Sequence, residues 1–186
     1  MDRRMSPRHI LLANVFFAPY SYGGATIVAE QVAHALIRKG GYEVTAVSLC
    51  CRHDLAPYTL IRSEQNGITN YIINVPHGRE YAQMYDNPQV TEVLKELIGW
   101  LKPDLVHAHC IQDIGTGILE AAEAAGVPVM PATKPLPEDA ATIKQLASDV
   151  GYPLMLKASW GGGGRGMRVV TEPQQICMQK AFRLQL

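Results

Sequence analysis

The sequence predicts an α/β fold: a doubly wound, mostly parallel sheet over residues 1–130, followed by a smaller α+β segment over residues 131–186. Two observations predict it. Near-continuous apolar runs such as residues 9–17 are typical of parallel strands that are covered on both faces. These runs alternate with stretches such as residues 25–40, in which apolar residues recur at helical spacing. Alternating strands and helices favour a parallel sheet flanked by helices.

The first part divides into nine predicted segments. In chain order they are a strand at 9–17, a loop at 18–24, a helix at 25–40, a strand at 42–50, a hairpin at 58–76, a helix at 87–100, a strand at 104–110, a helix at 115–126 and a short strand at 127–130. Asn66-Gly67 is a strong hairpin signal. Asn87 and Pro88 are typical of a helix start. The residues expected in the core are Ile10, Leu12, Val44, Val47, Leu105 and Val106.

The second part begins at a proline-rich stretch, residues 131–139, which is the best candidate for a domain boundary. Its predicted elements are a helix at 138–150, a strand at 152–159, a strand at 167–171 and a final helix at 172–186. A glycine-rich loop therefore joins two strands. This placement differs from a Walker loop, in which the glycines open a helix and the lysine comes last.

Composition excludes several function classes. Lysine plus arginine equals aspartate plus glutamate at 17 each, so no net field attracts nucleic acid or anionic lipid. The four cysteines form no CxxC pair, which favours a reducing compartment. Arg3, Arg4 and Arg8 precede an apolar run as in a signal peptide, but Asn14 interrupts that run. We therefore expect a cytoplasmic protein with no membrane span and no nucleic-acid partner.

The glycine-rich loop predicts an anion site. It reads KASWGGGGRGM, from Lys157 to Met167, and its glycines are Gly161, Gly162, Gly163, Gly164 and Gly166. Glycines let successive backbone N–H groups converge on phosphate oxygens, and Lys157 adds a point charge. Arg165 could clamp a ligand or lie outward, and spacing does not decide between them. A flexible linker is the alternative, but linkers are rich in serine and lack flanking apolar strands.

YPLMLKASWGGGGRGMRVV, together with the preceding VPVMPATKPLPED, resembles the ATP-grasp segment of biotin carboxylases, above all pyruvate carboxylase. The resemblance covers residues 125–171. It implies a partial ATP-grasp subdomain in which Lys157, Gly161 to Gly164, Arg165 and Gly166 hold ATP. The acidic magnesium ligands of that family are not evident, because Glu172 is the one acidic residue after Thr171.

The first part resembles a different family. HILLANVFFAPYSYGGATIVAEQVAHAL, GYEVTAVSL and KPDLVHAHCIQDIGTGILEAAEAAGVPV are similar to the N-terminal, Rossmann-like domain of retaining glycosyltransferases with two such domains. The resemblance implies that Gly23 and Gly24 lie near the donor phosphates and that His109 faces the cleft as the catalytic residue. A helix N-terminus attracts anions through its free N–H groups and its dipole.

The residues themselves leave alternatives open. Gly23 and Gly24 could form only a turn, and His109 could be a structural histidine. His107 and His109 are i, i+2 neighbours that could bind a metal, but a third ligand is not evident.

The two resemblances meet at AGVPVM, residues 125–130, which suggests two unrelated sequences joined at a shared string. Three functions follow. The first is a truncated fusion that lacks the second transferase domain and is catalytically incomplete. The second is an ATP-grasp ligase whose missing domains come from another chain. The third is a module that binds a nucleotide or sugar phosphate without turnover.

Overall fold

The computed structural model describes residues 7–129, 136–137, 139–158, 167–179 and 184–185. Contacts divide the chain into two compact units, Met1–Val129 and Met130–Leu186. Each unit has its own sheet and its own apolar core, so we describe each by itself.

The first unit is built on a five-stranded sheet in the order β3-β4-β2-β1-β5. The strands are β1 (Arg8–Ala13), β2 (Tyr42–Cys50), β3 (Leu60–Gln65), β4 (Ile68–Asn74) and β5 (Leu105–Ala108). β1 pairs in parallel with both β2 and β5, and β2 pairs in parallel with β4. The β3 strand alone runs antiparallel, at the edge, against β4. The predicted Rossmann-like, mostly parallel sheet is confirmed.

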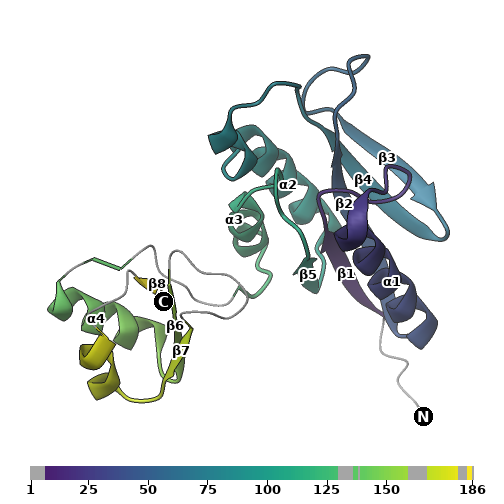
Figure 1. The fold of residues 1–186 in the computed structure, drawn as a ribbon. Helices are drawn as coiled ribbons and strands as arrows, with labels where there is room; N and C mark the ends of the chain where they lie inside the picture. The colour runs from purple at the N-terminus through teal and green to yellow at the C-terminus, as the bar shows by residue number, and fades with distance from the viewer. Residues whose placement is uncertain (1–6, 130–135, 138, 159–166, 180–183, 186) are drawn as a thin grey trace, which may run out of the picture. The chain divides into compact units, whose positions relative to one another are not determined.

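Helices cover both faces of this sheet (Figure 1). α1 (Gly23–Lys39) packs Ala29 and Ala33 against Leu12 and Ala46 on one face. The other face carries the larger core, which is covered by α2 (Pro88–Leu101) and α3 (Gly117–Ala124). Side chains alternate across a strand, so Leu11 and Leu12 of β1 enter different cores. Both are fully buried, as expected of a strand covered on both faces.

The β1 strand ends four residues earlier than the predicted strand at 9–17. Asn14 follows the strand, and its side-chain amide donates a 2.7 Å hydrogen bond to the carbonyl of Phe16. A side chain that bonds its own neighbouring backbone offers an alternative to the strand ladder and starts a turn.

The predicted hairpin and the predicted cap of α2 are both confirmed. Asn66 and Gly67 connect β3 to β4 with φ angles of 52° and 77°, which the Asn-Gly pair tolerates. Asn87 caps α2, since its side chain accepts a hydrogen bond from the amide of Val90, and Pro88 is the first helical residue.

Two sequence expectations near β5 are wrong. Leu105 was expected in the core but is 49% exposed, because β5 is a short edge strand with a neighbour on one side only. Residues 127–129 form no strand. The amide of Val127 bonds the carbonyl of Ala122 at 3.0 Å and so closes the end of α3. Pro128 has no N–H to donate to a ladder.

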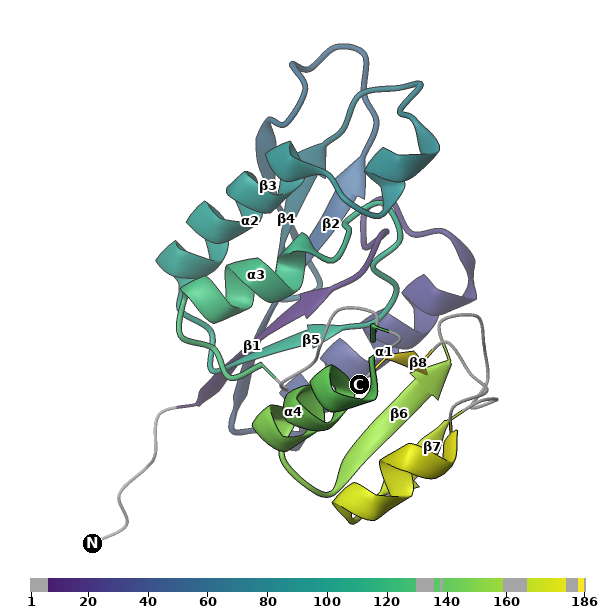
Figure 2. The same ribbon diagram turned by 90° about the vertical axis from the view of Figure 1, so that its left-hand side faces the viewer.

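The second unit is a small α+β layer (Figure 2). Its sheet has the order β7-β6-β8, made of β6 (Leu154–Ala158), β7 (Arg168–Val170) and β8 (Leu184–Gln185). The helix α4 (Ala140–Val150) starts at Asp139, which accepts a 2.7 Å hydrogen bond from the amide of Thr142. Leu154, Leu156 and Val170 point toward α4, where they pack with Ala147 and Ile176.

The final helix expected at 172–186 is wrong. The structure has the 3₁₀ helix η2 (Pro173–Gln179) and then the two-residue strand β8, which pairs with Lys157 and Ala158 of β6. Backbone pairing with β6 therefore overrides the helical spacing of the side chains. In the part of the chain that the structure describes, no helix is long and apolar enough to cross a bilayer.

Candidate functional site

The candidate site of the first unit lies where the sheet changes direction. The chain leaves β1 through α1 to β2 on one side and returns through α2 to β5 on the other side. The carboxyl ends of β1 and β5 are therefore adjacent while their continuing loops diverge. In open α/β sheets this is the place where ligands bind.

The loop after β1 leads to the start of α1 at this edge of the sheet, and that helix start has no side-chain cap. α1 begins at Gly23 and Gly24; Gly23 has a φ of 81°, which favours glycine. The residue before the helix, Tyr22, provides no side-chain cap, and the first turn contains no acidic residue. The N-terminal amides of a helix lack partners within the helix. The carboxylate of Glu30 in α1 accepts hydrogen bonds from the amide of Ala18 and the hydroxyl of Ser21 in the loop before the helix, while the helix dipole favours an anion at the N-terminal amides themselves.

His109 follows β5 at the same edge. Its amide donates a 2.9 Å hydrogen bond to the carbonyl of Ala13 at the end of β1. Its Nε2 is buried and has no hydrogen-bond partner in the structure. Burial lowers the pKa of His109, and the neighbouring His107, with ring centroids 4.3 Å apart, lowers it further. The imidazole of His109 is therefore neutral at physiological pH, when one ring nitrogen can donate and the other can accept.

Three buried asparagines hold the loops at this edge: Asn14, Asn70 and Asn74. Asn70 donates a 2.9 Å hydrogen bond to the carbonyl of Ala18 in the loop before α1. Asn74 donates to carbonyls of the loop after β2 and accepts the amide of Arg52 at 2.7 Å. Glu30 of α1 accepts the amide of Ala18 at 3.0 Å. Sequence reasoning did not find these residues as site residues, although an asparagine inside an apolar strand is a recognisable signal.

A largely buried ion pair holds the loop after β5. Arg79 donates to Asp113 at 2.9 Å and to the carbonyl of Pro76 at 2.8 Å. The two side chains are only 11% and 19% exposed. Asp113 has a φ of 66°, and its amide bonds the carbonyl of Met84 at 2.7 Å. The segment after β4 is thus fastened to the loop that leads from His109 into α3.

The predicted phosphate loop falls in the second unit. Lys157 lies on β6 and pairs with Gln185 of β8, whereas Gly161 to Gly166, including Arg165, lie outside the described residues. Gly23, Gly24 and His109 are brought to one edge of the first unit, and Lys157 belongs to the other unit.

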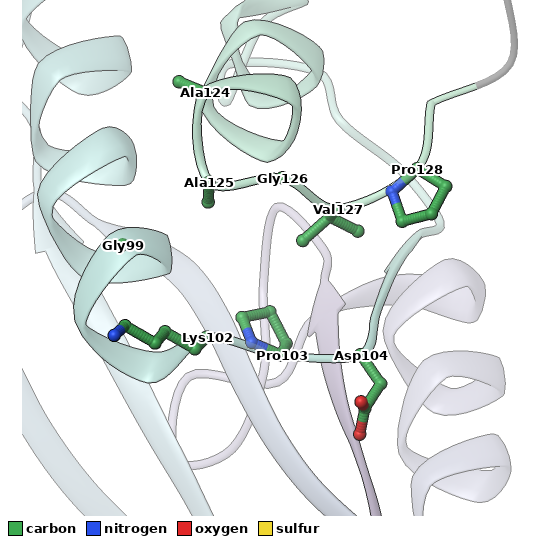
Figure 3. Close-up of a pocket in the computed structure, with 9 residues that line it drawn as sticks. All are labelled: Gly99, Lys102, Pro103, Asp104, Ala124, Ala125, Gly126, Val127 and Pro128. Carbon is green, nitrogen blue, oxygen red and sulfur yellow. The ribbon is translucent and has the colours of Figure 1, made fainter.

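Two further features of the described residues bear on where the site lies, the possible metal ligands and a cavity at another edge. Within the described ranges, no group of three or more His, Cys, Asp or Glu side chains could hold a metal ion. A cavity of about 510 Å³ opens at the opposite, amino edge, between the ends of α2 and α3 (Figure 3). Lys102 and Asp104 flank it with opposite charges. We place the site at the carboxyl edge because the strand ends and the uncapped helix meet there.

Two family models match the chain. One is described as Glycosyltransferase Family 4 and matches residues 22–131. The other is described as Carbamoyl-phosphate synthase L chain, ATP binding domain, and matches residues 117–184. The matches overlap at residues 117–131, which include α3 and the string at 125–130. In the structure α3 belongs to the first unit and packs on α2.

The curated relatives that the chain resembles include biotin carboxylases and pyruvate carboxylase. Biotin carboxylase of Pseudomonas aeruginosa is 50% identical over 58 residues, which are 31% of this chain and 13% of that protein. Biotin carboxylase 2 of Populus trichocarpa is 34% identical over 97 residues, 52% of this chain and 18% of that protein. Pyruvate carboxylase of Bacillus subtilis is 44% identical over 57 residues, 31% of this chain and 5% of that protein. The chain thus spans less than a fifth of the length of these relatives, and this partial coverage is consistent with a fusion of two segments.

Solved structures give a weaker likeness. The biotin carboxylase domain of a thermophilic 2-oxoglutarate carboxylase, bound to ADP without magnesium, is 18% identical with a TM-score of 0.30; the match covers 92% of this chain and 39% of that one. The biotin carboxylase subunit of pyruvate carboxylase is 18% identical with a TM-score of 0.25, covering 94% of this chain and 40% of that one.

Proposed function

The chain belongs to glycosyltransferase family 4 through residues 22–131, and on this premise we propose that its first unit binds the diphosphate of a sugar nucleotide. The observation that carries the proposal is the uncapped start of α1 beside the end of β5. The amides at Gly23 and Gly24 supply donors, and the helix dipole supplies a positive potential. A Cβ at either glycine would meet no atom within 4 Å, so the space beside these backbone amides is open.

His109 is the catalytic residue of this proposal. A buried ring nitrogen without a partner is costly, and a ligand hydroxyl or phosphate oxygen would satisfy it. The lowered pKa of His109 keeps the ring neutral, so it forms hydrogen bonds without changing the charge of the site. The contribution we assign to it is orientation of the donor sugar at the end of β5.

The second unit is proposed to bind ATP. A match to an ATP binding domain covers residues 117–184, and the sequence from Lys157 to Gly166 combines a lysine with five glycines, a composition typical of loops whose backbone amides bind phosphate. Lys157 would contact the phosphates, Gly161 to Gly164 would enclose them, and Arg165 and Gly166 would complete the loop.

A carboxylate placed at the start of α1 tests the donor site. Gly24→Asp is expected to weaken binding of uridine diphosphate about tenfold or more, because the new charge occupies the anion position. The same charge should stabilise α1 by about 0.3–1 kcal/mol. Calorimetric titration should therefore show a lower affinity for uridine diphosphate, while thermal unfolding should show a higher melting temperature.

Gly24→Ala is the matched control, because its Cβ enters open space and leaves the backbone amide in place. Its affinity for uridine diphosphate should stay close to that of the wild type. If Gly24→Asp binds uridine diphosphate as well as Gly24→Ala does, the start of α1 is not the phosphate site.

We further propose that the 186 residues, expressed by themselves, are catalytically incomplete. The first unit offers one edge of a donor site, and the match to a biotin carboxylase covers 13% of that protein. A purified sample is expected to release no nucleotide from a panel of sugar nucleotides while still binding uridine diphosphate. If nucleotide release co-purifies with the protein and is lost in the His109→Ala variant, the chain is catalytically complete and the proposal is wrong. Magnesium-dependent ATP hydrolysis would instead favour a ligase that is complete in this chain or is completed by another one.

A further inference from the structure

We propose that Asn14 is a positioning residue that couples the two halves of the donor site, the start of α1 and the end of β5. The proposal rests on the proposed function for its ligand, but not for the coupling itself. Asn14 is fully buried, directly after β1, between the two elements that it would couple.

Both the oxygen and the nitrogen of the Asn14 side-chain amide form hydrogen bonds. Oδ1 accepts a 3.0 Å hydrogen bond from the amide of Cys110, the residue after His109. Nδ2 donates to the carbonyl of Phe16 at 2.7 Å and contacts Oγ1 of Thr26 at 3.4 Å. The backbone reinforces the first link, because the amide of Val15 donates to the carbonyl of Cys110 at 2.8 Å.

Thr26 continues the connection to the helix start. It is fully buried in α1, and its hydroxyl donates a 2.7 Å hydrogen bond to the carbonyl of Tyr22, the residue before Gly23. Hydrogen bonds thus run from Cys110 through Asn14 and Thr26 to Tyr22. A buried polar network in which each member depends on the next holds its parts in one arrangement.

The chemistry of this position favours asparagine. It needs an acceptor for one backbone amide and donors for a carbonyl and a hydroxyl, all without charge. Aspartate has the same shape but loses the donors and places a negative charge close to the anion site. Leucine fills similar space and would leave the amide of Cys110 and the carbonyl of Phe16 unsatisfied.

The test uses the whole chain, with uridine diphosphate as the probe and the imidazole resonances of His109 as a second readout. Thr26→Val removes the hydroxyl, and Asn14→Asp removes the donors. Both are expected to shift the His109 resonances and to weaken probe binding about tenfold, the loss expected for one buried hydrogen bond. Thr26→Ser keeps the hydroxyl and should restore both readouts, which guards against a variant that fails only by folding poorly.

Thr45→Val is the matched control. Thr45 is buried in the first half of β2, in the same sheet, and its hydroxyl is 2.8 Å from Nε2 of His9. The same change of threonine to valine therefore removes a hydroxyl that is not part of the hydrogen bonds from Cys110 to Tyr22. It should change neither His109 nor probe binding. Unchanged His109 resonances in Thr26→Val would overturn the coupling even if probe binding falls. A wild-type chain that binds no probe, while His109 still responds to Thr26→Val, would refute the proposed function and leave the coupling standing.

Discussion

Gly117→Ala is expected to lower the free energy of unfolding of the first unit by about 2–3 kcal/mol, the cost of overpacking a core. A Cβ at Gly117 would lie 1.8 Å from Oγ1 of Thr91 and 2.8 Å from its Cβ. Thr91 cannot easily move aside, because it is buried and its hydroxyl donates a 3.1 Å hydrogen bond to the carbonyl of Asn87. The added methyl group must therefore push α3 away from α2. Urea unfolding followed by circular dichroism measures the loss.

The control for this substitution is Gly99→Ala, in which a glycine of α2 is also replaced by alanine. A Cβ at Gly99 would meet no atom within 4 Å. Alanine is favoured over glycine in a helix by about 0.8–1 kcal/mol, so this variant should be as stable as the wild type or more stable. Equal losses in both variants would mean that α3 does not pack on α2 through Gly117.

Lys157→Ala is expected to weaken ATP binding about ten- to a hundredfold, since a hydrogen bond to a charged group contributes about 1.5–3 kcal/mol. Lys157 lies on β6, directly before the glycine-rich loop. Calorimetric titration with ATP, with and without magnesium, measures the effect. Affinity is expected to be low even in the wild type, because the described residues contain no group of three or more His, Cys, Asp or Glu side chains that could hold magnesium beside the phosphates.

Lys144→Ala controls for the general loss of a positive charge from the same unit. Lys144 is an exposed residue of α4, and its removal leaves the β6 strand and its loop intact. ATP affinity should stay near the wild-type value. If the Lys157→Ala variant still binds ATP tightly, ATP binds at another place in the chain. The resemblance to carboxylases would then not predict the ATP site.

Much of the first unit could be predicted from local patterns. Asn66-Gly67 and the Asn87-Pro88 pair determine a turn and a helix start through their own backbone preferences, and the structure has both. Residues 44–50 of β2 are seven consecutive buried positions, as a doubly covered strand requires. Gly23, Gly24 and His109 were expected at one site, and they follow the adjacent strand ends of β1 and β5. Their roles in binding and catalysis stay predictions.

The sequence by itself determined where strands and helices alternate, because apolar periodicity and turn residues act over a few neighbouring positions. The tertiary structure alone decided which strand became an edge. Leu105 has the same apolar character as Leu12, yet one is half exposed and the other is fully buried, because β5 has a single neighbour and β1 has two. It likewise decided that Asn14 would join residues 96 positions apart, from the end of β1 to Cys110. Contacts of such long range arise from how strands are ordered in the sheet, and no local pattern contains that order.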